Sequence, residues 1–154
     1  MWRARRIKAP SLLLICNQEI IKSKGNNMAE KKKILLIDDE KDLCFFLKAN
    51  LENTGEFDVI ISNRGDKGIK LAQREKPDLI LLDILMPEMS GDEVAENLLE
   101  DPATAKIPII FLTAMVTKAE IGDVTLQKRG GRNFIAKPIT TEELVGAIKK
   151  VLGI

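Results

Sequence analysis

Two short runs of apolar residues each end in acidic residues. Lys33–Ile37 (KILLI) is followed by Asp38 and Asp39, and Leu79–Leu82 (LILL) is followed by Asp83. Apolar runs of this length with polar boundaries are typical of strands that are buried on both faces of a parallel sheet. The carboxyl ends of such strands line the binding crevice in open α/β folds. The pattern therefore predicts that the three carboxylates converge at one edge of a sheet.

Strand-like and helix-like segments alternate along the chain after Met28. Helical spacing occurs between the strands, for example at Leu43, Leu47 and Leu51. Five strands and five helices are predicted, and right-handed crossovers favour one doubly wound parallel sheet of the flavodoxin-like order 2-1-3-4-5. The predicted strands are Ile34–Ile37, Phe57–Ile61, Leu79–Leu82, Ile107–Leu112 and Phe134–Ala136. The predicted helix boundaries are Gly55, Pro77, Gly91 and a capping box of Thr140 with Glu143.

The predicted acidic cluster has the chemistry of a metal site. Three carboxylates at one sheet edge repel one another unless a cation binds among them. An all-oxygen cluster without thiolate or imidazole is the ligand set of a hard cation, so we expect Mg²⁺. Histidine is absent from the whole chain, which excludes His-based acid–base catalysis and the usual zinc ligands. The site suits a metal ion and a phosphoryl group.

The composition suits one small domain in a reducing compartment. The chain has 154 residues, of which 45% are hydrophobic, and this is enough for one ordinary core. Cys16 lies in a basic segment and Cys44 in an apolar helical pattern, so neither a disulfide framework nor a zinc site is indicated. We therefore expect a cytoplasmic protein.

Residues 1–27 differ in composition from the rest. They hold six Lys/Arg and one acid, a balance of +5, so with +1 for the whole chain the remaining residues carry −4. A secretory signal fits poorly, because its apolar core would be residues 12–16, shorter than the about 7–15 residues that such a signal needs. A basic arm for nucleic acid or acidic lipid is an alternative, although aromatic residues beyond Trp2 are lacking there.

The interpretation that we favour for this leader is a disordered segment or a misassigned start site. Lys24–Met28 back-translates to a purine-rich stretch before ATG that resembles a bacterial ribosome-binding site. The domain is then residues 28–154, and no nucleic-acid or membrane partner is expected.

Four motifs follow one another in a fixed order at the predicted strand ends. They are Asp38-Asp39, Asp83 within Leu-Leu-Asp-Ile-Leu-Met-Pro-Glu-Met-Ser-Gly, Thr113-Ala114 and Lys137-Pro138. The ordered set, over residues 31–154, resembles the receiver domain of two-component response regulators. The resemblance implies a switch that takes a phosphoryl group from a histidine kinase or phosphotransfer protein and then changes its surface for a downstream target. Such a domain is not an enzyme in the usual sense, because it catalyses only its own Mg²⁺-dependent phosphorylation and slow dephosphorylation.

The resemblance also implies the ligands of the site. Asp83 is expected to be the phosphoacceptor, a carboxylate nucleophile that becomes an aspartyl phosphate. Asp38, Asp39, Asp83 and the backbone carbonyl of Leu85 are expected to hold Mg²⁺, for which Mn²⁺ could substitute. Asp39 is expected to be the more direct ligand, although an Asp in this place can also serve only as a helix N-cap.

Two polar residues and an aromatic residue complete the expected switch. Lys137 is expected to point its ammonium at the phosphate, with a cis bond to Pro138. Thr113 is expected to donate its hydroxyl to a phosphoryl oxygen, and Phe134 to turn inward when Thr113 moves. Taken alone, a strand-end Thr is more often structural and a Lys at the start of a loop is usually solvated, so these roles depend on the whole set.

Two further features concern lifetime and partner. Leu85 and Met115 flank the expected approach of the hydrolytic water, and both are apolar and bulky, so slow loss of phosphate is expected. The stretch between Thr113 and Phe134 is longer and richer in Gly than the usual receiver pattern. The fourth helix is therefore expected to be short or mobile, and the partner that reads this face is left open.

Two other functions fit parts of the pattern. A phosphatase of the haloacid dehalogenase type also uses an Asp nucleophile with Thr, Lys and Mg²⁺, but there the nucleophile follows the first strand, whereas Asp83 comes after the acidic pair. A pseudo-receiver, which is a binding module that works without phosphorylation, lacks acidic or Lys positions that are all present here. We therefore expect a stand-alone receiver whose kinase and target are unidentified.

Overall fold

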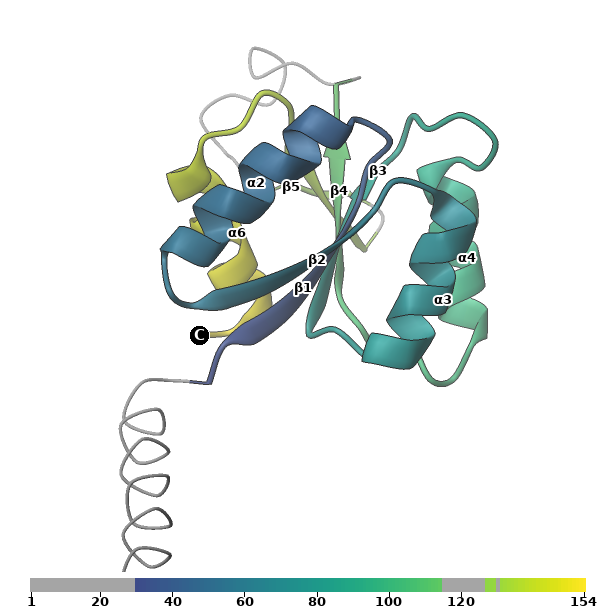
Figure 1. Cartoon of the computed structure of the whole chain (residues 1–154). Helices are drawn as coiled ribbons and strands as arrows, with labels where there is room; N and C mark the ends of the chain where they lie inside the picture. The colour runs from purple at the N-terminus through teal and green to yellow at the C-terminus, as the bar shows by residue number, and fades with distance from the viewer. Residues whose placement is uncertain (1–29, 115–126, 130) are drawn as a thin grey trace, which may run out of the picture. The chain divides into compact units, whose positions relative to one another are not determined.

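The strands form one sheet of order β2-β1-β3-β4-β6-β5 in the computed structural model, which describes residues 30–114, 127–129 and 131–154 (Figure 1). Every neighbouring pair from β2 to β6 is parallel. The predicted order 2-1-3-4-5 is therefore confirmed, with β6 as the fifth parallel strand. The strands are β1 (Lys32–Ile37), β2 (Phe57–Ser62), β3 (Leu79–Asp83), β4 (Ile109–Thr113), β5 (Gln127–Arg129) and β6 (Arg132–Ala136).

The short strand β5 is a departure from the predicted five-stranded sheet. It pairs antiparallel with β6, with Arg129 opposite Arg132, so the sheet has a sixth strand at its edge. Gln127–Arg129 is wholly polar and has no period-2 alternation, which is why the hydrophobic pattern missed it. The Gly-Gly pair before β6 is a two-residue hairpin signal, and Gly131 has φ +79° in the structure.

The two faces of the sheet have separate hydrophobic cores. Side chains alternate along β1, so Ile34 and Leu36 pack into the core under α2 and α6, whereas Leu35 and Ile37 pack into the core under α3 and α4. Figure 1 shows these helix pairs on opposite sides of the sheet. The described helices are α2 (Lys41–Asn53), α3 (Gly65–Glu75), α4 (Gly91–Glu100) and α6 (Thr141–Leu152).

The helix boundaries follow the predicted signals. Thr140 and Glu143 form the predicted capping box at the start of α6. A second capping box, of Ser90 with Glu93, begins α4 directly after the loop that leaves β3. Both caps lie in connections that leave the carboxyl edge of the sheet, after β3 and after β6.

Several predictions fall outside the described residues. They are the leader 1–27, the fourth of the five predicted helices and the side chain of Met115. Contacts along the chain separate Met1–Lys31 from the unit Lys32–Ile154, and the fold given above belongs to the second unit. In the part of the chain that the structure describes, no helix is long and apolar enough to cross a membrane.

Candidate functional site

The predicted site residues lie where four parallel strands end. Asp38 follows β1, Asp83 is the last residue of β3, Thr113 is the last residue of β4 and Lys137 follows β6. Parallel strands expose their carboxyl ends at one edge, so side chains that are far apart in sequence meet there. The β1–β3 boundary is the place at which the strand order reverses, and the acidic residues lie on either side of it.

Three carboxylates are brought together at this edge. One oxygen each of Asp38, Asp39 and Asp83 lie within 4.8 Å of one another. Asp38 is fully buried, Asp83 is 5% exposed and Asp39 is half-buried. Carboxylates that lie this close together and are largely shielded from water repel one another, so the cluster favours the binding of a cation.

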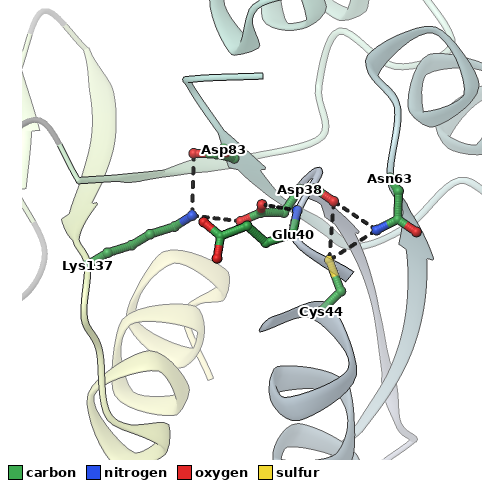
Figure 2. A network of polar contacts seen from close by, with 6 residues as sticks. All are labelled: Asp38, Glu40, Cys44, Asn63, Asp83 and Lys137. Carbon is green, nitrogen blue, oxygen red and sulfur yellow. Dashed lines mark hydrogen bonds and ion pairs between the residues drawn. The ribbon is translucent and has the colours of Figure 1, made fainter. Parts of the chain in front are cut away.

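The ammonium of Lys137 lies between two of these carboxylates (Figure 2). Its Nζ is 2.7 Å from Asp38 Oδ2 and 3.4 Å from Asp83 Oδ1. Burial lowers the pKa of Lys137, but the hydrogen bond and charge of Asp38, and then the charge of Asp83, outweigh burial and raise it above the ordinary lysine value. Lys137 therefore remains charged, and a single positive charge faces three acids.

The Asp83 carboxyl group holds its proton more tightly than an ordinary aspartic acid does. Burial, followed by the negative charge of Asp38, raises the pKa of Asp83 to about 6, although the charge of Lys137 opposes the shift. A site cation would favour the ionised form. The ionised form of this carboxylate therefore depends on neighbouring positive charge.

Asp38 is fixed through all of its polar groups. Its Oδ1 accepts a hydrogen bond from Glu40 N–H at 3.0 Å and its Oδ2 accepts one from Lys137. Its backbone carbonyl accepts from Asn63 Nδ2 at 2.9 Å and from Cys44 Sγ at 3.3 Å. Burial, followed by the charge of Asp38, raises the pKa of Cys44 to about 12, so the thiol stays protonated and can donate.

Sequence reasoning missed Asn63 and Cys44 as parts of this site. The hydrophobic pattern places Cys44 only on an apolar helix face, and Cys44 does lie on the buried face of α2. Asn63 follows β2 directly, at the same sheet edge as the acids. A polar amide directly after a predicted strand was the sequence signal that could have placed Asn63 at this edge of the sheet.

Thr113 and Phe134 lie on the adjacent strands β4 and β6. Thr113 is buried, and its carbonyl accepts a hydrogen bond from Lys137 N–H at 2.8 Å. The Phe134 ring stacks on Phe111, with centroids 5.1 Å apart and planes inclined by 22°. The expected switch aromatic is therefore already packed against the core on the α3/α4 face.

The loop after β3 runs close behind Asp83. Gly91 N–H donates to Ile84 O at 2.9 Å, and a Cβ on Gly91 would meet Asp83 O at 2.3 Å. Gly91, the first residue of α4, is thus required for this approach. Leu85, two residues after Asp83, has a side chain that is 60% exposed. The Lys137–Pro138 bond is cis, as the resemblance implied.

The fold and the site together define a class of protein. A buried carboxylate at the switch point of a doubly wound sheet, with two further acids and one ammonium beside it, can accept a phosphoryl group with the help of a divalent cation. The model of the response regulator receiver domain matches residues 34–149. The chain belongs to this family, whose members are the phosphoacceptor modules of two-component signal transduction.

Curated relatives differ in how much of their length is matched. The chain is 37% identical over 122 residues to the protein PilH of Pseudomonas aeruginosa, and covers 98% of PilH and 79% of itself. It is 36% identical over 121 residues to the alkaline phosphatase synthesis transcriptional regulatory protein PhoP of Bacillus subtilis, and there it covers only 48% of the relative and 79% of itself. The chain thus spans about half of PhoP.

Solved structures share the fold. A response regulator from Desulfuromonas acetoxidans has a TM-score of 0.65 and 30% identity, covering 79% of this chain and 97% of that one. The chemotaxis protein CheY4 of Vibrio cholerae has a TM-score of 0.66 and 25% identity, covering 79% and 98%. The receiver domain of sensor histidine kinase PA1611 from Pseudomonas aeruginosa, with magnesium in its active site cleft, has a TM-score of 0.67 and 23% identity, covering 80% and 99%.

Proposed function

We propose that Asp83 is the phosphoacceptor of this receiver domain. In the proposed reaction an Asp83 carboxylate oxygen attacks the phosphorus of a phosphohistidine, the new P–O bond forms, and the P–N bond breaks with release of the imidazole. The observation that carries the proposal is the Asp83 side chain itself, a buried strand-end carboxylate close to two acids and to the Lys137 ammonium. These 154 residues include no histidine, so a donor phosphohistidine would lie outside them.

The acidic cluster is proposed to hold Mg²⁺, with Mn²⁺ as a substitute. The donor set fits, because Asp38, Asp39 and Asp83 supply only oxygens and leave more negative than positive charge after Lys137 is counted. We propose Asp83 and the backbone carbonyl of Leu85 as the further ligands. The ion would supply neutralisation of charge on the phosphoryl oxygens. Both oxygens of Asp38 already accept hydrogen bonds, which favours Asp39 as the more direct ligand.

Lys137 and Thr113 are proposed to receive the phosphoryl group. The Lys137 ammonium lies 3.4 Å from the attacking carboxylate of Asp83, which supports a role in charge stabilisation of the transferred group. Thr113 ends the strand next to β3 and is proposed to donate its hydroxyl to a phosphoryl oxygen. Phe134 is proposed to respond to the movement of Thr113. The protein would thus catalyse its own phosphorylation and slow dephosphorylation, and no other reaction.

The donor is proposed to be a histidine kinase or a phosphotransfer protein that docks beside Lys137. A groove of about 460 Å³ lies there, lined mainly by apolar groups of α2 and of the turn after β6, among them Leu43, Phe46 and Ile139. Phe46 is 59% exposed, and a partner that covered it would bury apolar surface while bringing its phosphohistidine to Asp83. A downstream target would read the altered surface.

The proposed domain is residues 28–154, and its proposed location is the cytoplasm. The described cysteine, Cys44, is a buried free thiol, which suits a reducing compartment. Residues 1–27 are proposed to be dispensable for the phosphoryl-transfer chemistry.

The direct test is intact-mass spectrometry after treatment with acetyl phosphate and Mg²⁺. The wild type should gain one phosphoryl group, and Asp83→Asn should gain none. Asp78→Asn is the matched control, because Asp78 lies just before the same strand and its carboxylate accepts from Lys33 N–H instead of entering the cluster. Equal labelling of Asp83→Asn and wild type would overturn the assignment.

A further inference from the structure

The peptide group that joins Asp38 to Asp39 is held from two sides. Its carbonyl oxygen accepts from the side-chain amide of Asn63 at 2.9 Å and from the thiol of Cys44 at 3.3 Å. The two donors are themselves 3.6 Å apart, and Figure 2 shows both of them on the side of Asp38 away from Lys137. Asn63 comes from the end of β2, and Cys44 comes from the first turn of α2.

This carbonyl needs donors because the sheet ladder ends here. Asp38 N–H donates to Ser62 O at 3.1 Å, which continues the parallel pairing of β1 with β2. The next bond of a parallel ladder would come from Arg64 N–H, but that group lies 3.4 Å from Ser62 Oγ. Asp38 is fully buried, so an unpaired carbonyl at this point would be costly. The side chain of Asn63 replaces the missing backbone donor.

The peptide group links this contact to the acidic site. A peptide unit is planar, so fixing the direction of the Asp38 carbonyl also fixes the direction in which the chain enters the Cα of Asp39. The Asp38 carboxylate is fixed separately, by Glu40 N–H and Lys137. Of the two acids, Asp39 thus depends more on the peptide plane for the aim of its side chain.

We propose that Asn63, assisted by Cys44, is a positioning residue that aims the Asp39 carboxylate at the cation site. The inference deepens the proposed function, because it rests on Asp39 as a ligand of Mg²⁺. Neither Asn63 nor Cys44 is proposed as a ligand of the cation or of the phosphoryl group. Both act on the backbone between the two acids.

The experiment uses the full chain, labelled with ¹⁵N, in two steps. In EDTA, the residual dipolar coupling of the Asp39 N–H reports the orientation of the peptide plane, and in a Mg²⁺ titration the same spectrum gives the dissociation constant. Asn63→Ala should change the coupling and weaken Mg²⁺ binding roughly tenfold, the usual scale for removal of a group that orients a metal ligand. Asn63→Gln, which keeps the donor, should recover part of the affinity.

Matched variants separate positioning from general stability. Asn97→Ala removes an equivalent bond, from Asn97 Nδ2 to Glu93 O at 2.8 Å on the exposed side of α4, and should leave both measurements unchanged. Cys44→Ser keeps a donor and should bind Mg²⁺ more tightly than Cys44→Ala. Asn63→Leu, which has nearly the shape of Asn and no donor, repeats the test if Asn63→Ala does not fold.

The outcomes are distinguishable from those of the proposed function. A folded donorless Asn63 variant with wild-type coupling and wild-type Mg²⁺ affinity would overturn the inference. If the wild type itself bound no Mg²⁺ at the cluster, the metal proposal and Asn63's role in aiming a ligand would both be overturned. An altered Asp39 coupling in Asn63→Ala would then show only that Asn63 orients the peptide.

Discussion

Lys137 Nζ lies closer to Asp38 than to Asp83, at 2.7 Å against 3.4 Å, so the main partner of the ammonium is the fully buried Asp38 and not the proposed phosphoacceptor. Removal of this charge leaves a buried carboxylate without its ion-pair partner. The pairing therefore has a structural role besides any role toward phosphate. Two properties of the unphosphorylated protein depend on it, the stability without metal and the protonation of Asp83.

The first prediction concerns Lys137→Met. Without metal, this variant should lose about 3 kcal/mol of unfolding free energy, because breaking one half of a buried ion pair leaves the other charge desolvated. It should still bind Mg²⁺, since all three acids remain, and Mg²⁺ should restore part of the stability. Urea unfolding with EDTA and with Mg²⁺ measures both effects.

The control for this prediction is Lys149→Met. Lys149 pairs with Glu56 at 2.7 Å, but both side chains are well exposed, so the loss should stay below about 1 kcal/mol. Equal losses in the two variants would contradict a special role of the Lys137–Asp38 pair.

The second prediction is a pH dependence that arises from Asp83. Its pKa is raised from 3.8 to about 6 in the folded protein, so the folded state holds this proton more tightly than the unfolded chain does. The stability that this group contributes is fully present below the unfolded pKa and is lost as the pH rises through about 6. Metal-free Asp83→Asn should therefore exceed the wild type in stability above pH about 7, by on the order of 2 kcal/mol, and the gap should close at low pH.

Urea unfolding of metal-free protein over this pH range tests the second prediction. Asp78→Asn changes a carboxylate just before β3 that accepts from Lys33 N–H, and it should show no such pH-dependent gain. A wild-type stability that rises between pH about 4 and 6 relative to Asp83→Asn would have the wrong sign.

The sequence predicted those elements of the fold that bury apolar side chains. The apolar runs of β1 and β3 alternate between two covered faces, and no other element type satisfies both cores. Strand β5 could not be found in this way. Gln127–Arg129 has no apolar residue that would mark it as a strand, and it is assigned through its backbone pairing with β6 at the sheet edge. Edge pairing is a tertiary choice that hydrophobic periodicity does not encode.

The sequence predicted the charged residues of the candidate site, but not the residues that hydrogen-bond to the backbone of the site. The charged residues of the site could be predicted because strand ends bring them together in this topology. They are Asp38, Asp39, Asp83 and Lys137. Asn63 and Cys44 donate to a backbone carbonyl, and the sequence shows that Asn63 is polar but not which carbonyl it reaches. The preference of Lys137 for Asp38 over Asp83 likewise depends on distances that only the folded chain fixes.

The third prediction concerns the coupling between Thr113 and Phe134. Phosphorylation should shift a two-state equilibrium that moves Phe134 relative to Phe111, whose rings are stacked in the structure. Thr113→Ala should accept phosphate but fail to alter hydrogen exchange around Phe134, whereas Thr113→Ser, which keeps the hydroxyl, should behave as wild type. If phosphorylated Thr113→Ala showed the same change in hydrogen exchange around Phe134 as the wild type, this coupling would be ruled out.

The fourth prediction is that a chain begun at Met28 retains the chemistry. The unit Lys32–Ile154 contains the acidic cluster, Lys137 and both cores, so its stability should not require residues 1–27. Melting temperature, Mg²⁺ affinity and acetyl phosphate labelling should match those of the full chain. A drop of several degrees in melting temperature on truncation would show that the leader is part of the fold.

The last prediction concerns the lifetime of the aspartyl phosphate, and it depends on two apolar residues. Hydrolysis needs a water in line with the bond that breaks, and neither Leu85 nor Met115 can orient one by hydrogen bonding. Leu85 is 60% exposed and lies two residues after Asp83, the proposed phosphoacceptor, while Met115 lies outside the described residues.

Replacing these residues by polar ones should shorten that lifetime. Leu85→Asn combined with Met115→Glu should accelerate loss of phosphate roughly tenfold, which corresponds to about 1.4 kcal/mol of barrier. Leu99→Asn is the matched control, because Leu99 is 54% exposed but lies near the end of α4, far from Asp83 in the sequence. The aspartyl phosphate of this variant should have the same half-life as that of the wild type. Phosphate loss followed by intact mass after removal of the donor gives the three rates. A double variant as slow as wild type would mean that the water is controlled elsewhere in the site.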